Sequence, residues 1–238
     1  MADNPLLPQD RLREMHALML RIRDMEKRRP KTRTQTSSRP AREALLAATA
    51  LHLKPGDLFS APADDGTLRE LAPASPSGAP SHDLPASLRI PLCAGAARGM
   101  KAAGVDNVTV AFANARLHEP LWTDAIAWAQ RDELPLILLC ADVQQTSRMP
   151  RARPHDPPLA WTSITQLTRK LRMPLFPVDG HDAVAVYRVM QEITGRARSN
   201  GGPSIVWAVL NPGPLPRREQ PVARLEAYMA ARNISLRA

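Results

Sequence analysis

Residues 132–142 read DELPLILLCAD, in which an uninterrupted apolar run from 135 to 141 follows two acids. The run shows no alternation between polar and apolar positions, which is typical of a strand that is buried on both faces. Such strands occur in parallel sheets whose two faces are covered by helices. We therefore predict a buried strand over 135–141.

The residues around this strand repeat an alternation of strands and helices. The predicted strands are 108–113, 135–141, 175–178 and 204–210, and the predicted helices between them are 119–131, 163–170 and 182–198. This order is typical of a parallel sheet with right-handed crossovers. The fold class that it predicts is α/β, as a three-layer α/β/α sandwich with a mostly parallel sheet.

Helices and loops are predicted in the remainder of the chain. Apolar residues at helical spacing predict an amphipathic helix over 9–27, and further helices are predicted at 41–53, 91–103 and 220–232. Three regions follow from this pattern. They are an N-terminal helical arm with a basic linker (1–60), a loop region rich in Pro, Ala and Ser (61–90) and an α/β domain (91–238).

Composition excludes several classes of protein. The 238 residues are 44% hydrophobic and 23% charged, which excludes wholesale disorder. The longest apolar runs fall short of the roughly 18 residues that a membrane span needs. Two cysteines, Cys93 and Cys140, exclude a disulfide scaffold and a four-cysteine zinc site within the chain. The first residues lack a signal pattern, so we expect a soluble cytoplasmic protein.

The formal charge of +9 is concentrated between Lys27 and Arg42, where seven cations occur without an acid. Interleaved Ser and Thr with two prolines favour an exposed, solvated loop. Binding of nucleic acid or of an acidic partner is the alternative. No aromatic residue for base stacking accompanies the run, so the sequence argues against nucleic acid.

Several blocks of sequence occur together in one order. They are LREMHALMLRIRDMEKR (12–28), IPLCAGAARGMKAAGVDNVTVAFANA (90–115), DELPLILLCAD (132–142) and VDGHDAVAVY (178–187). Together they resemble the alpha subunit of the first component of thiamine-diphosphate-dependent 2-oxo acid dehydrogenases. The resemblance implies a thiamine-diphosphate-binding-like fold and pairing with a beta subunit, usually in an α2β2 assembly.

The resemblance also implies where a cofactor would lie. In that family a Gly-Asp-Gly turn after one strand and an Asn at the end of the next strand hold Mg²⁺ and, through it, the diphosphate. The matching positions here are Ala113, Asn114 and Ala115 for the turn and Val143 for the Asn. Gln145 matches a carbonyl ligand. Mg²⁺ needs oxygen ligands, usually including a carboxylate, so these residues predict a degenerate metal site.

Other family elements that hold the phosphates are altered too. The Tyr-Arg-x-His stretch of the family matches Pro62, Ala63, Asp64 and Asp65, and two acids repel a diphosphate. Residues 211–216 replace the family's catalytic His loop. We therefore predict no bound cofactor and no metal, with thiamine diphosphate and Mg²⁺ as the expectation if the chain is active.

Other candidates for chemistry carry weaker signals. Cys93 and Cys140 fall in a small-residue helix and an apolar strand, where cysteine is usually inert. His118 lies in the former active-site turn, and a satisfied surface histidine accounts for it. His155 has no second ligand at metal spacing. Asp182 fits a helix N-cap. We predict no catalytic residue.

Three functional hypotheses remain open at this point. The leading one is a non-catalytic scaffold or regulatory subunit that associates with a beta-like chain or with itself. The second is an active alpha subunit completed by a beta subunit, and the third is a basic module that binds nucleic acid or an acidic partner.

Overall fold

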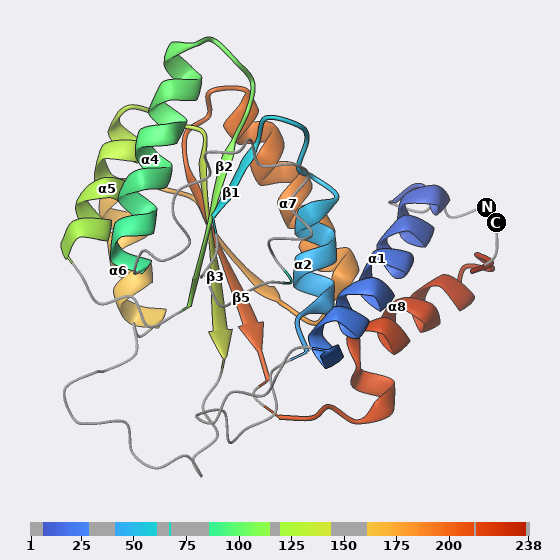
Figure 1. Ribbon diagram of the computed structural model, residues 1–238. Coiled ribbons are helices and arrows are strands. Elements are labelled where there is room, and N and C mark those ends of the chain that lie inside the picture. Colours follow the sequence, from blue (N-terminus) through green and yellow to red (C-terminus); the bar gives the residue numbers. More distant parts are fainter. Residues whose placement is uncertain are drawn as a thin grey trace.

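The computed structural model describes residues 7–28, 41–60, 67, 86–114, 120–143, 161–211 and 213–236. Within them a single parallel sheet runs through the molecule in the order β1-β2-β3-β5-β4 (Figure 1). The strands are β1 (Leu58–Ser60), β2 (Thr109–Asn114), β3 (Leu136–Val143), β4 (Leu175–Asp179) and β5 (Ser204–Leu210). The predicted α/β fold class is confirmed.

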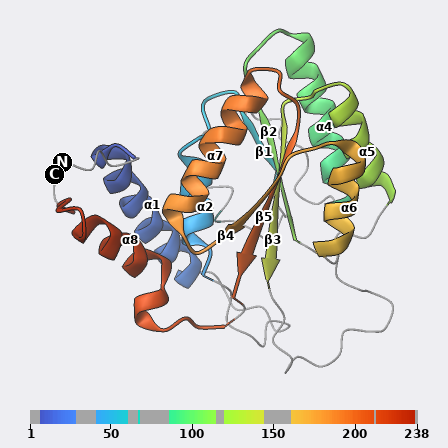
Figure 2. The same ribbon diagram turned by 180° about the vertical axis from the view of Figure 1, so that it is seen from behind.

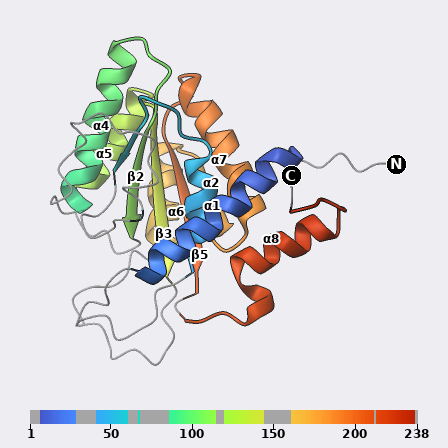
Figure 3. The same ribbon diagram turned by 45° about the vertical axis from the view of Figure 1, so that its right-hand side comes forward.

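Helices cover both faces of the sheet (Figures 1 and 2). One face carries α4 (Ala86–Ala102), α5 (Pro120–Arg131) and α6 (Trp161–Leu171), and the other carries α2 (Glu43–Ala50) and α7 (Ala183–Arg198). Beyond α2 lie α1 (Gln9–Arg28) and α8 (Pro221–Ala230), preceded by the 3₁₀ turn η1 (Arg217–Glu219). Figure 3 shows α1 and α8 next to each other.

Each face of the sheet has its own apolar core. The α4–α5–α6 side buries residues of β1, β2, β3 and β5, including Trp207. The opposite side joins the sheet to α2, α7, α1 and α8. The four apolar residues that predicted the first helix, Leu12, Met15, Met19 and Ile22, are all fully buried there. This burial explains why an otherwise highly charged helix is held against the domain.

Two elements begin where the sequence pattern did not place them. Strand β1 occupies the last three residues of the predicted N-terminal region (1–60), and it pairs in parallel with β2. Three residues are too few for a periodic signal. Helix α4 begins at Ala86 and continues through Pro91, where the prediction began it. Proline there costs the helix one hydrogen bond without ending it. Strand β1 thus adds to the sheet, and the first turn of α4 adds to the helical layer, from residues before the predicted domain 91–238.

The turn between β4 and α7 packs tightly against β5. The Gly180 N–H donates to the Val209 carbonyl at 2.9 Å. A Cβ at Gly180 would lie 2.6 Å from Leu210 Cδ2 and 3.1 Å from Val209 O. Asp182 caps α7 by accepting from Val184 N and Ala185 N, so the predicted N-cap is confirmed. The absence of a side chain at 180 thus lets the turn approach the end of β5.

We expect Gly180→Ala to lower the free energy of unfolding by about 1–3 kcal/mol, because the added carbon overlaps well-packed atoms. The matched control is Gly195→Ala in α7, where a Cβ would meet nothing within 4 Å. That change should be neutral or should stabilise by about 0.5–1 kcal/mol. Urea denaturation measures both, and equal effects of the two substitutions would show that the close approach is unimportant.

Candidate functional site

The carboxyl ends of β2, β3 and β5 meet at one edge of the sheet, where ligands of open α/β sheets usually bind. The register pairs Asn114 with Ala141 and Val143 with Leu210. Asn114 is thus the last residue of β2, and Val143 is the last residue of the adjacent strand. The structure brings these two predicted positions to the same edge of the sheet.

The carboxylate of Asp142, one residue before the end of β3, makes a hydrogen bond to the core. Asp142 Oδ2 accepts a hydrogen bond from Trp207 Nε1 at 3.1 Å. Trp207 belongs to the core beneath α4, α5 and α6, so the Asp142 carboxylate is drawn toward that side of the sheet. Successive side chains of a strand point to opposite faces. Asp142 therefore points away from the face on which Val143 lies.

The groups at these positions do not fit Mg²⁺. Val143 is aliphatic and 36% exposed, Ala113 is buried and aliphatic, and position 114 carries an amide in place of a carboxylate. Hard divalent cations bind oxygen donors with at least partial negative charge. Over the part of the chain that the structure describes, no group of three His, Cys, Asp or Glu side chains could hold a metal ion. We therefore derive no chemical step through a metal or cofactor.

Several predicted positions lie outside the described residues. These are Pro62, Ala63, Asp64, Asp65, Ala115, His118, Gln145 and His155.

A buried histidine, His181, forms hydrogen bonds at the same edge of the sheet, next to the end of β5. His181 is only 3% exposed; its Nδ1 lies 3.0 Å from the Ala41 carbonyl, and its Nε2 lies 2.9 Å from the backbone N of Asn211. Since Asn211 N–H donates to Nε2, the proton of the neutral ring resides on Nδ1 and is donated to Ala41. Burial lowers the pKa of His181. The neutral ring thus joins the start of α2 to the residue after β5.

Arg224 of α8 binds the two acids that flank the turn containing His181. Its guanidinium bonds Asp179 at 2.6 Å and Asp182 at 3.2 Å. Burial acts to raise the pKa of Asp179, but the bonds from Arg224 and from His181 N–H outweigh it and hold the pKa below its usual range. The sequence predicted only the N-cap role of Asp182. It gave no signal for Arg224, which lies 42 residues from Asp182.

Neither cysteine is a candidate nucleophile. Cys93 is fully buried, and Cys140 is 3% exposed. Burial raises the pKa of the Cys93 thiol to about 11 and that of Cys140 to about 12. The thiolate, which is the reactive form, is therefore scarce near neutral pH.

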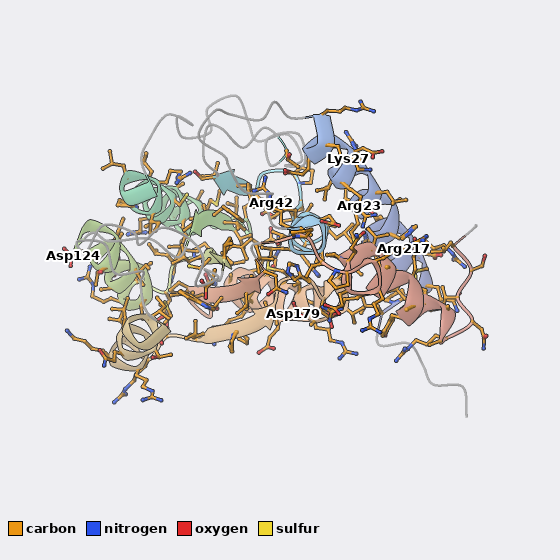
Figure 4. The ribbon with its side chains drawn as sticks, turned by 90° about the horizontal axis from the view of Figure 1, so that it is seen from below. Arg23, Lys27, Arg42, Asp124, Asp179 and Arg217 are labelled. Atoms are coloured by element: carbon orange, nitrogen blue, oxygen red, sulfur yellow. The ribbon has the colours of Figure 1, made fainter. Side chains whose placement is uncertain are left out.

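Three cations of α1 and of the start of α2, which Figure 4 labels, form ion pairs with acids. Arg23 lies 3.1 Å from Glu43, Arg42 lies 2.5 Å from Glu26 and Lys27 lies 3.5 Å from Asp24. Lys27 and Arg42 are the two ends of the predicted basic run, and residues 29–40 lie outside the described residues. These ion pairs reduce the positive charge that the described part of the run offers to an anion.

None of the helices in the described residues has the length and apolar character to cross a bilayer.

Comparison with known sequences points to one family. Two alpha subunits of 3-methyl-2-oxobutanoate dehydrogenase, from Mycobacterium tuberculosis strains CDC 1551 / Oshkosh and ATCC 25618 / H37Rv, are each 33% identical over 116 residues. The match covers 48% of this chain and 30% of each relative. The chain thus corresponds to less than a third of the length of these curated relatives.

Comparison with solved structures supports the same fold. An enzyme from Mycobacterium smegmatis described as thiamin diphosphate-dependent superposes with a TM-score of 0.56, and benzoylformate decarboxylase from Polynucleobacter necessarius superposes with 0.53. Each is 14% identical and is matched over 79% of this chain and 36% of its own. At this identity the likeness shows the fold alone.

The family model of the dehydrogenase E1 component matches residues 81–210, which is more than half of the chain. The matched range contains β2, β3, β4 and β5 with α5, α6 and α7. Three of the four blocks that carried the resemblance, at 90–115, 132–142 and 178–187, lie within the matched range, whereas the block at 12–28 lies on α1 outside it. The chain therefore belongs to the dehydrogenase E1 component family.

Proposed function

We propose that this chain is an E1 alpha-like protein that does not bind magnesium and thiamine diphosphate by itself. It serves as a non-catalytic scaffold or regulatory subunit. One observation carries this proposal: the adjacent ends of β2 and β3 bear Asn114 and Val143, and the neighbouring Asp142 is bonded to Trp207. Asn114 and Val143 carry no carboxylate, and the Asp142 carboxylate is directed toward Trp207 on the α4–α5–α6 side of the sheet, so these residues offer a divalent cation no anionic ligand at the two strand ends.

We also propose that the chain works in the cytoplasm as one member of an assembly, with a beta-type chain or a second copy as its partner. The relatives from Mycobacterium tuberculosis are named as alpha subunits, which supports an assembly. Arg23 and Arg42 are paired with Glu43 and Glu26, so their charges are partly neutralised and less able to bind phosphates. These pairs favour a protein partner over nucleic acid.

The second candidate is an active alpha subunit that a beta chain completes. Family membership favours it, as does the fold shared with a thiamin diphosphate-dependent enzyme. Under this alternative the cofactor would be thiamine diphosphate with Mg²⁺, and its ligands would come from residues outside the strand ends described above.

Reconstitution with a beta chain separates the two candidates. The full chain, co-purified with the beta chain of a 2-oxo acid dehydrogenase, is assayed for reduction of an electron-accepting dye by pyruvate and by 3-methyl-2-oxobutanoate. We expect turnover no higher than that of the beta chain alone. Turnover that Asn114→Leu abolishes, and that the exposed control Gln191→Leu preserves, would establish the active-subunit alternative.

A further inference from the structure

Four elements of the fold meet around the imidazole of His181. The residue belongs to the turn between β4 and α7 and is 3% exposed. Its Nδ1 donates to the carbonyl of Ala41, which precedes α2, and its Nε2 accepts from the N–H of Asn211, which follows β5. From α8, Arg224 binds the two acids of the same turn. We refer to the hydrogen bonds from His181 to Ala41 and to Asn211 as the His181 bridge.

The His181 bridge requires an uncharged ring. Only the neutral imidazole has one nitrogen that donates and one that accepts, and these are the two roles that Ala41 and Asn211 need. A protonated ring carries a hydrogen on both nitrogens. Its Nε2–H would then face the N–H of Asn211, with the two nitrogens 2.9 Å apart. Protonation therefore breaks the bond to Asn211, whereas the bond to Ala41 is kept.

The charges that face His181 do not remove this restriction. They come from every neighbouring element: Asp179 and Asp182 from the turn, Glu43 from α2 with its partner Arg23 from α1, and Arg224 from α8. Burial is the largest effect, and it lowers the pKa of His181 below its ordinary value. Asp179 and Glu43 act in the opposite direction, but each is already bonded to an arginine, and Arg224 adds to the effect of burial.

The direction of the pH effect follows from this difference between the closed and the open bridge. A solvated histidine has a pKa of about 6.5, whereas the buried ring of the closed bridge resists the proton. The open form therefore binds the proton more tightly, and lowering the pH favours opening. Between pH 7.5 and pH 5.5 the population of the open form gains a factor of about ten while the closed ring stays neutral.

We propose that the His181 bridge is a pH-sensitive latch, which holds the chain after β5 against the β4–α7 turn at neutral pH and releases it in mild acid. Arg224 keeps α8 bonded to the turn in both forms, so the opening is confined to the connection between β5 and α8. That connection begins beside Leu210, which pairs with Val143 at the carboxyl edge of the sheet. The proposal concerns the conformation of the chain and holds whether or not the chain has catalytic activity.

Hydrogen exchange of the native full chain, followed by NMR at single amides, measures the opening. The protection factor of the Asn211 amide, which is corrected for the intrinsic pH dependence of exchange, should fall by about tenfold from pH 7.5 to pH 5.5. The Ile205 amide donates to the Pro174 carbonyl at the other end of β5 and should keep its protection factor. This comparison separates release of the latch from loosening of the whole sheet.

The variant His181→Gln assigns the effect to the ring. Glutamine carries an acceptor that does not titrate, so the Asn211 protection factor of this variant should not change with pH. The matched control is His16→Gln, which removes a histidine that lies 2.9 Å from Glu226 and has a side chain 13% exposed; the tenfold fall should remain. His52 stays neutral in this range, because burial lowers its pKa to about 4. Circular dichroism verifies that each variant keeps the fold.

Three results would overturn the proposal. The first is an Asn211 protection factor that is the same at both pH values, and the second is an equal fall at Ile205. Both of these use the native chain, so they apply even where a variant fails to fold. The third is a tenfold fall that persists in His181→Gln. None of these measurements involves a cofactor or a beta chain, so the reconstitution assay decides the proposed function separately.

Discussion

Replacing Asp57 with alanine is expected to lower the free energy of unfolding by about 3–5 kcal/mol, since it leaves the charge of Arg198 without its buried partner. The side chain of Asp57 is 1% exposed, and its Oδ2 lies 2.6 Å from Arg198 Nη2. The same carboxylate accepts from the backbone N–H groups of Lys54 and Val108 and from the Asn107 amide. The Asp57 carboxylate therefore connects the residues before β1 and β2 to the C-terminal end of α7.

Urea denaturation of purified variants measures this loss. The control is Asp106→Ala, which removes an ion pair to Lys54 at the same end of the sheet; the Asp106 side chain is 69% exposed. We expect no measurable change from the control, because exposed ion pairs contribute little. The double variant Asp57→Ala/Arg198→Met should be more stable than Asp57→Ala alone, because it removes the unpaired charge. A loss for Asp57→Ala no larger than that of the control would contradict this account.

The interior strands could be predicted from the sequence because burial on both faces leaves a local signal. The runs predicted at 135–141 and 204–210 correspond to β3 (Leu136–Val143) and β5 (Ser204–Leu210). Strand β1 left no such signal. It is short, and its position depends on pairing with β2, which lies about fifty residues away in the chain. Long-range pairing of this kind is not encoded in a local pattern.

The candidate site could be predicted in part. The resemblance matched Asn114 and Val143 to ligand positions, and the register places them at the ends of adjacent strands. The bonds that occupy the neighbouring polar groups could not be predicted. Trp207 and Asp142 are 65 residues apart, and His181 and Ala41 are 140 apart. Only the folded sheet brings these partners together.

The affinity of the chain for magnesium and thiamine diphosphate distinguishes the proposed non-catalytic role from that of an active subunit. An E1 alpha chain that has lost the carboxylate at position 114 and the amide at 143 offers the cation no strong ligand from these strand ends. The diphosphate then lacks the charge that would hold it at the edge of the sheet. Restoring both groups in the variant Asn114→Asp/Val143→Asn should therefore raise the affinity for magnesium and thiamine diphosphate above that of the native chain.

Isothermal titration calorimetry of the full chain with thiamine diphosphate in the presence of MgCl₂ measures that affinity directly. The account predicts no saturable heat up to about 1 mM ligand, which corresponds to binding weaker than about −4 kcal/mol. A dissociation constant in the micromolar range that EDTA and Asn114→Leu both abolish would contradict it.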